Sequence, residues 1–198
     1  MQLLQHAPVP ATAITLRLAH VDGAATRARI AAGFSTSTAF ISLSPGLICV
    51  FDSPDSTGLT HQEVGAAGVS VHQLWNVAAE QLISRAQRDD GVEFLVRCPS
   101  VALDCDELPR GFEVDGHDSP AAWWLSHPRP FTLLHRHFEA VLQPETGLVY
   151  ATRDWRELFV FDADADEVAR HLPGANVLAY SVAVSYTHLR AHETKANL

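Results

Sequence analysis

The chain has 198 residues, of which 47% are hydrophobic and 19% are charged, a balance typical of one globular domain rather than of a disordered segment. Its formal net charge is −9 and it has no run of lysine or arginine, which argues against nucleic acid or an anionic membrane surface as a partner. The N-terminus lacks a signal-peptide pattern and no segment is long and apolar enough to span a membrane, so we expect a cytoplasmic protein.

The first part of the chain predicts three strands. Residues 14–21 (ITLRLAHV) alternate apolar and polar side chains, which is typical of a half-buried strand. Residues 25–34 (ATRARIAAGF) have the weaker pattern of a short helix ended by Gly33. Residues 39–52 (AFISLSPGLICVFD) read as two strands joined by a type II turn, because Pro45 presets φ and Gly46 accepts a positive φ.

A helix over residues 71–87 is the clearest local prediction. Ser70 with Gln73, and Thr60 with Glu63 before it, fit the capping box, in which two side chains satisfy unpaired backbone donors at the start of a helix. The apolar residues of this segment fall on one helical face, as in an amphipathic helix. They are Val71, Leu74, Trp75, Ala78 and Leu82.

The second half predicts further strands around another amphipathic helix. Residues 92–98 predict a strand, and residues 101–108 and 111–116 predict strands or loop. Ser119 and Pro120 open a short helix, and the HPRP sequence interrupts it before a helix over residues 130–142 that places Phe131, Leu134, Phe138, Val141 and Leu142 on one face. A hairpin (147–153 and 157–162, around Asp154 and Trp155), a short helix (164–172) and a strand (176–182) follow. No βαβ rhythm repeats, so we expect a single α+β domain over residues 1–183 with a largely antiparallel sheet and two main amphipathic helices.

Two groups of polar residues resemble metal sites. His135 and His137 form an H-x-H pair, but residues i and i+2 point apart on a helix, so we expect no shared metal. Asp162, Asp164 and Asp166 copy the start of an EF-hand loop, but Glu167 and Pro173 stand where that loop needs glycine and glutamate. We expect Asp164 with Glu167, or Asp166 alone, to cap a short helix instead.

Asp104 and Asp106 are the remaining candidates for chemistry. On an extended segment they share one side, and with one or more histidines they define a metal-assisted hydrolase hypothesis. Cys105 lies between them, and with Cys49 and Cys98 it is interpreted as a buried reduced thiol. No lysine precedes Lys195, which excludes Schiff-base chemistry and lysine-dependent phosphate binding from the rest of the chain. The sequence therefore predicts no metal and no cofactor, and it leaves catalytic residues unknown.

Trp123 and Trp124 suggest a different kind of function. Tryptophan and arginine anchor many protein interfaces, and adjacent helical residues diverge by about 100°, so we expect one of the two rings to be exposed. The leading hypothesis is a small acidic protein that binds another protein through this helix. The metal-assisted hydrolase and a structural subunit of a larger assembly are the alternatives, and the oligomeric state stays open.

Three segments carry a resemblance to a known family. They are VSVHQLWNVAAEQL, FTLLHRHFEAVL and GLVYATRDWRELFVFDA, which cover under half of the chain. In their order they resemble the YtpQ-like family of bacterial proteins, a resemblance that implies an arrangement of elements and no activity. The use of arginine in place of lysine, with abundant Ala, Asp and His, indicates a GC-rich bacterial genome.

Residues 184–198 (VSYTHLRAHETKANL) differ from the rest of the chain. They contain Lys195, the only lysine, against thirteen arginines in the whole chain. The codons GTC TCT TAT ACA CAT CTC CGA GCC CAC GAG of a transposon-end sequencing adapter translate as VSYTHLRAHE. We therefore interpret residues 184–198 as a non-native tail, expect it to be disordered, and expect His188 and His192 to serve no site. The same residues upstream of a stop codon in an assembled genome would contradict this interpretation.

Overall fold

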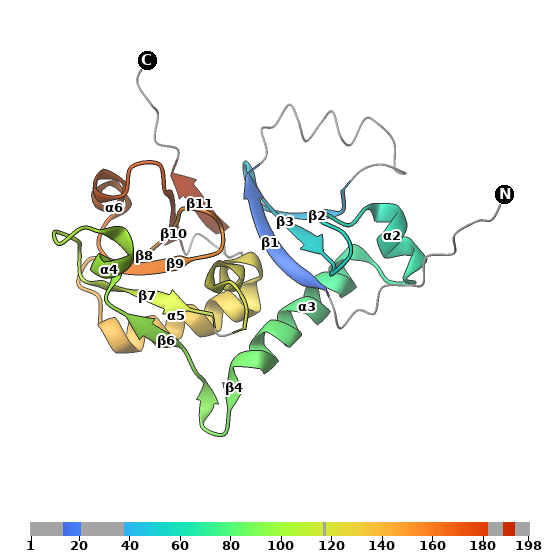
Figure 1. The fold of residues 1–198 in the computed structure, drawn as a ribbon, viewed down its shortest axis with the longest axis horizontal. Coiled ribbons are helices and arrows are strands. Elements are labelled where there is room, and N and C mark those ends of the chain that lie inside the picture. Colours follow the sequence, from blue (N-terminus) through green and yellow to red (C-terminus); the bar gives the residue numbers. More distant parts are fainter. Residues whose placement is uncertain (1–13, 21–37, 117, 182–187, 193–198) are drawn as a thin grey trace, which may run out of the picture.

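Two antiparallel sheets lie side by side, with helices packed against both (Figure 1). The computed structural model describes residues 14–20, 38–116, 118–181 and 188–192. The small sheet has the order β1-β3-β2. Its strands are β1 (Thr15–His20), β2 (Phe40–Ser44) and β3 (Leu47–Asp52). The predicted strand and hairpin are confirmed, and Gly46 has the expected positive φ of 78°. The predicted helix over residues 25–34 lies outside the described residues.

Helices α2 (His61–Ala66) and α3 (Val71–Ala86) follow the small sheet. Both predicted capping boxes are present: Thr60 accepts a hydrogen bond from the Glu63 N–H, and Ser70 accepts one from the Gln73 N–H. The glutamate and glutamine side chains accept in return from the cap N–H groups, so backbone donors at both helix starts are satisfied. Among the described helices, none is long and apolar enough to cross a membrane.

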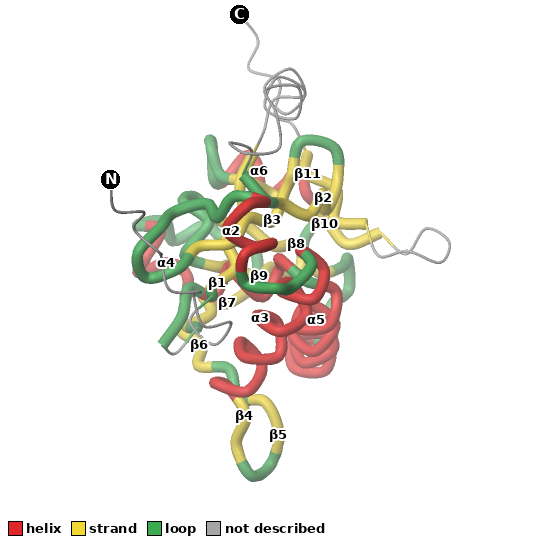
Figure 2. The backbone as a smooth tube through the Cα atoms, turned by 90° about the vertical axis from the view of Figure 1, so that its right-hand side faces the viewer, coloured by secondary structure: helices red, strands yellow, loops and turns green. Residues whose placement is uncertain are grey.

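The large sheet is antiparallel throughout, in the order β11-β10-β8-β9-β7-β6. This arrangement confirms the expected α+β class. A short hairpin precedes β6 and projects from the body of the molecule (Figures 1 and 2). Each of its strands, β4 (Gln87–Arg88) and β5 (Gly91–Val92), has two residues. The strands are β6 (Leu95–Arg97), β7 (Gly111–Asp115), β8 (Leu148–Thr152), β9 (Leu158–Asp162), β10 (Asn176–Ser181) and β11 (His188–His192).

Both faces of the large sheet are covered. On one face, α5 (Pro128–Leu142) and the 3-10 helix η2 (Ala121–Ser126) bury their apolar side chains against alternate strand residues such as Tyr150 and Val160. On the other face, α6 (Ala165–His171) and α4 (Pro99–Leu103) pack against the intervening residues, such as Phe159 and Phe161. β8 and β9 are therefore buried on both sides, which explains their nearly continuous apolar sequences.

Helix α3 joins the two sheets. Leu74 and Ala78 in its first half belong to the core of the small sheet, whereas Leu82 and Ile83 belong to the core beneath the large sheet. Two polar contacts strengthen this junction. The Trp75 indole N–H donates to the Ser126 carbonyl at 2.9 Å, and the His127 ring nitrogen Nε2 lies 3.1 Å from Asn76 Oδ1.

His127 is also the N-cap residue of α5, and this role of its ring makes the stability of the fold depend on pH. Its Nδ1 accepts a hydrogen bond from the Arg129 N–H at 3.0 Å, so Nε2 carries the proton that Asn76 accepts. Burial, which penalises the charged ring, and to a lesser extent the positive charge of Arg129 lower the pKa of His127 from 6.5 to about 4.

We expect wild-type stability to fall as the pH drops from 6.5 towards 4. The folded state keeps His127 neutral while the unfolded chain takes up a proton below its pKa of 6.5, so the contribution is present above 6.5 and is lost on acidification. With allowance for the part of the ring that is open to solvent, the loss is about 1 to 2 kcal/mol. Urea unfolding across this range should show a steeper slope in the wild type than in His127→Asn, whose side chain can cap without titrating, while the half-buried His135 and His137 keep part of the slope in both. Equal slopes would contradict the assignment.

Four local predictions are wrong in part. Residues 101–103 are helical in α4 rather than extended, because Pro99 occupies the first helical turn, where it is tolerated. Ser119 does not cap η2 with its side chain; its hydroxyl donates to the Gly116 carbonyl instead. The HPRP sequence begins α5 rather than interrupting a helix, since His127 supplies the cap. Val141 is 52% exposed and does not join the buried face of α5.

The expected disorder of residues 184–198 is wrong for His188–His192, which form β11 beside β10. This short sequence alternates polar and apolar residues, the pattern of a strand. β10 without β11 would present unpaired N–H and C=O groups at the sheet edge, and such an edge pairs with an extended segment whatever its origin. The rest of this segment lies outside the described residues.

Candidate functional site

The structure places Trp123 and Trp124 differently, but neither ring is exposed. Trp124 is 1% exposed and packs edge-on against Phe94, with ring centroids 4.8 Å apart. Trp123 is partly buried against the same core. The predicted divergence of the two rings is confirmed, whereas the predicted exposure of one of them is wrong. Trp124 cannot contact a partner without rearrangement of the core.

Asp104 and Asp106 do not form a metal site in the described structure. Asp104 ends α4 in the left-handed conformation, with φ of 49°, and Asp106 lies in the bend that follows. Among the side chains that the structure describes, no three of His, Cys, Asp or Glu come together as metal ligands. The expected burial of the thiols is confirmed for Cys49, where it raises the pKa to about 12, but Cys98 is exposed and Cys105 is half-buried.

His135 and His137 diverge on α5, as helix geometry predicts. His135 faces β8, where its Nδ1 lies 2.9 Å from the Tyr150 hydroxyl. His137 lies beside Phe94 instead, with the two ring centroids 5.0 Å apart. Burial lowers the pKa of both histidines. The two side chains face different parts of the structure, so this pair is not arranged to hold one ion.

Asp162 and Asp164 have structural roles. Asp164 accepts a hydrogen bond from the Glu167 N–H at 2.7 Å and caps α6, as predicted. Asp162, for which the sequence suggested no role, accepts from the Thr146, Glu145 and Gly147 N–H groups and from Arg110. These donors hold the pKa of the Asp162 carboxyl well below its usual range. Asp162 therefore fixes the loop between α5 and β8.

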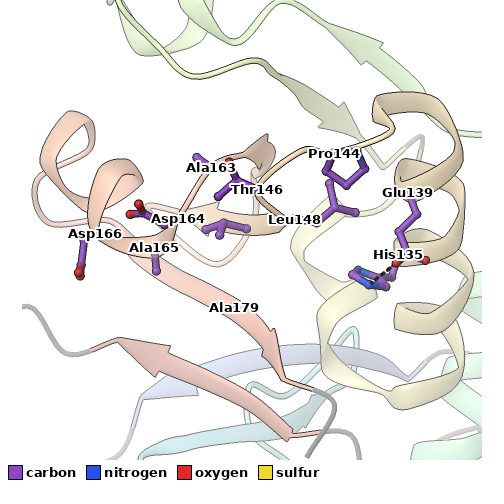
Figure 3. A pocket seen from close by; sticks show the side chains of 12 residues that line it. His135, Glu139, Pro144, Thr146, Leu148, Ala163, Asp164, Ala165, Asp166 and Ala179 are labelled. Carbon is purple, nitrogen blue, oxygen red and sulfur yellow. Dashed lines mark ion pairs between the residues drawn. The ribbon is translucent and has the colours of Figure 1, made fainter.

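A cavity of about 520 Å³ opens beside this loop, between α5 and the start of α6 (Figure 3). Leu148 and Ala179 contribute apolar surface to it. Its polar side chains are His135 and Glu139 from α5, Thr146 from the loop, and Asp164 and Asp166 from the start of α6.

A chain of polar contacts runs from this cavity into the core. Glu139 Oε1 lies 3.4 Å from His135 Nε2, and the other ring nitrogen of His135 meets Tyr150. Burial raises the pKa of Tyr150, so its hydroxyl stays protonated and donates to Nδ1 while Nε2–H faces the Glu139 carboxylate. The spacing of His135 and Glu139 is visible in the sequence as i and i+4, but nothing local points to Tyr150. Because Tyr150 is fully buried behind His135, the cavity offers an imidazole and carboxylates but not the tyrosine hydroxyl.

The exposed edge of the large sheet, formed by β6, is the second candidate site. β6 is an edge strand that pairs with β7 on one side and with no other described strand. All three of its residues are exposed, including two large apolar ones, Leu95 at 47% and Val96 at 43%. Val101, in the helix that follows, is 81% exposed. We call Leu95, Val96 and Arg97 with the adjacent Val101 the β6 edge.

Arg97 is the polar member of the β6 edge. Its guanidinium makes two hydrogen bonds to the Glu113 carboxylate on β7, at 2.5 and 2.6 Å. This pair anchors β6 to the sheet on one face. It leaves the apolar side chains of Leu95 and Val96, which point to opposite faces, open to solvent.

No protein-family model, curated protein or solved structure matches this chain.

Proposed function

We propose that this protein is a cytoplasmic protein-binding module whose binding site is the β6 edge. The observation that supports this proposal is the concentration of exposed apolar side chains on and beside an edge strand: Leu95 and Val96 of β6 and Val101 of α4 lie within seven residues. Natural proteins usually protect strand edges with charge, proline or a covering element, because bare edges recruit further strands. An apolar edge left open suits the addition of an extended segment from a partner.

The β6 edge replaces the tryptophan helix as the proposed interface. Trp124 is part of the core and Trp123 is partly buried against it, so the two rings expose less apolar surface than Leu95 and Val96. Leu95 and Val96 offer apolar contacts on both faces of the strand, and the outer backbone groups of β6 offer main-chain hydrogen bonds. Together they supply the two elements of strand addition, main-chain pairing for affinity and side-chain contacts for specificity.

Selection from a library of random extended peptides tests this function. We expect peptides that bind the wild type to lose at least tenfold in affinity for the double variant Leu95→Ser/Val96→Ser, which removes apolar contact without changing the charge. Hydrogen exchange should show protection of the β6 amides on binding. Val141→Ser, which alters an equally exposed valine on α5, is the matched control.

Circular dichroism and thermal unfolding should first show that both variants are folded. A library in which no peptide distinguishes the double variant from Val141→Ser would contradict the proposed function.

A further inference from the structure

The charges around the β6 edge indicate what kind of segment it binds. From residue 88 to residue 107 the chain has six carboxylates and two arginines, a net charge of 2 − 6 = −4, which is nearly half of the −9 of the whole chain. Both arginines are already paired, Arg88 with Glu93 and Arg97 with Glu113. Five carboxylates of this stretch have no ion pair with any described residue: Asp89, Asp90, Asp104, Asp106 and Glu107.

These carboxylates lie on both sides of the edge strand. Asp89 and Asp90 form the turn of the projecting β4–β5 hairpin, and the other three follow α4. Both views of the backbone show β6 between that hairpin and α4 (Figures 1 and 2). A segment paired along β6 would therefore meet apolar surface at its centre and negative charge at each end.

We infer that the β6 edge binds a basic extended segment of another protein, with two or three apolar residues flanked on both sides by lysine or arginine. This inference rests on the proposed function and names the chemistry of the partner. Successive strand residues point to opposite faces, so adjacent Leu95 and Val96 match two adjacent apolar residues of the incoming strand. The basic flanks match the unpaired carboxylates on either side. A second copy of this chain fits poorly, because its own β6 edge brings the same negative charges.

A panel of matched peptides tests this inference. For each of several apolar pairs at the centre, three peptides carry two lysines, two glutamines or two glutamates on each side, and fluorescence anisotropy measures their affinity. We expect lysine-flanked peptides to bind at least tenfold more tightly than glutamine-flanked ones, and an increase in salt from about 50 to 500 mM to remove most of that advantage. Asp89→Asn/Asp90→Asn should weaken lysine-flanked peptides about threefold and leave glutamine-flanked ones unchanged.

The outcomes separate the inference from the function on which it rests. If glutamine-flanked or glutamate-flanked peptides bind as tightly as lysine-flanked ones, and Leu95→Ser/Val96→Ser abolishes that binding, the basic partner is wrong and the proposed function stands. If lysine-flanked peptides bind equally well to this double variant, the basic site lies elsewhere and the inference is overturned. If no peptide depends on Leu95 and Val96, both are overturned.

Discussion

Replacement of Trp124 by alanine is expected to lower the free energy of unfolding by about 3 to 5 kcal/mol. The ring is fully buried between η2, Phe94 and α5, and its removal leaves a cavity that the surrounding side chains cannot fill. Urea unfolding followed by circular dichroism measures the change. Trp123→Ala is the matched control and should cost clearly less, because that ring is only partly buried.

The outcome bears directly on how binding data are interpreted. A Trp124→Ala variant that loses a partner would do so through loss of the fold, whereas the proposed interface leaves Trp124 untouched. Equal destabilisation by the two substitutions would contradict the difference in burial. A folded Trp124→Ala variant that specifically lost partner binding would instead restore the tryptophan helix as the interface.

Asp162→Ala is expected to cost about 2 to 4 kcal/mol, because several backbone N–H groups and Arg110 lose a charged acceptor together. The Asp162 side chain is only 7% exposed, so water does not readily replace it. Asp166→Ala, at an exposed position in the first turn of α6, is the control and should cost less than about 1 kcal/mol. Amide hydrogen exchange should show loss of protection in residues 145–147 for the first variant alone.

The same carboxylate predicts a second acid-dependent loss of stability. The hydrogen bonds keep the folded-state pKa of Asp162 below its unfolded value, so its contribution is present above about pH 4 and is lost as the pH falls below that value. The pH range of this loss lies below the range in which His127 lowers the stability. Asp162→Ala should therefore keep the slope between pH 6.5 and 4 and flatten the curve below it. An unchanged curve below pH 4 would contradict the role of Asp162.

Local signals in the sequence predicted much of the fold. The structure confirms four predictions that involve residues close together in the chain. They are the capping boxes at Thr60 and Ser70, the turn at Gly46 and the helix cap at Asp164. Where the pattern was ambiguous between strand and loop, as at residues 101–103, Pro99 at the first helical turn favoured a helix. His188–His192, expected to be disordered, form β11 instead, because an alternating segment can pair with an open sheet edge such as that of β10.

The candidate sites depended on contacts between distant segments. The strand order places β7 next to β9 and leaves β6 at the edge, which no local pattern in residues 92–98 indicates. The hydrogen bond between His135 and Tyr150 forms only because α5 packs on β8. Exposure of Leu95 and Val96 is equally a property of the assembled sheet, since their sequence reads as that of any half-buried strand.

Helix α3 contributes side chains to both cores, so we expect the two sheets to unfold together. Its first half supports one core and its second half the other, and Trp75 and Asn76 tie it to the start of α5. Local melting of the small sheet would strip Leu74 and Ala78 of their contacts and unwind the same helix that buries Leu82 and Ile83. Unfolding that begins in either half therefore spreads through α3 to the other, and a substitution in the small sheet lowers the stability of the distant β6 edge as well.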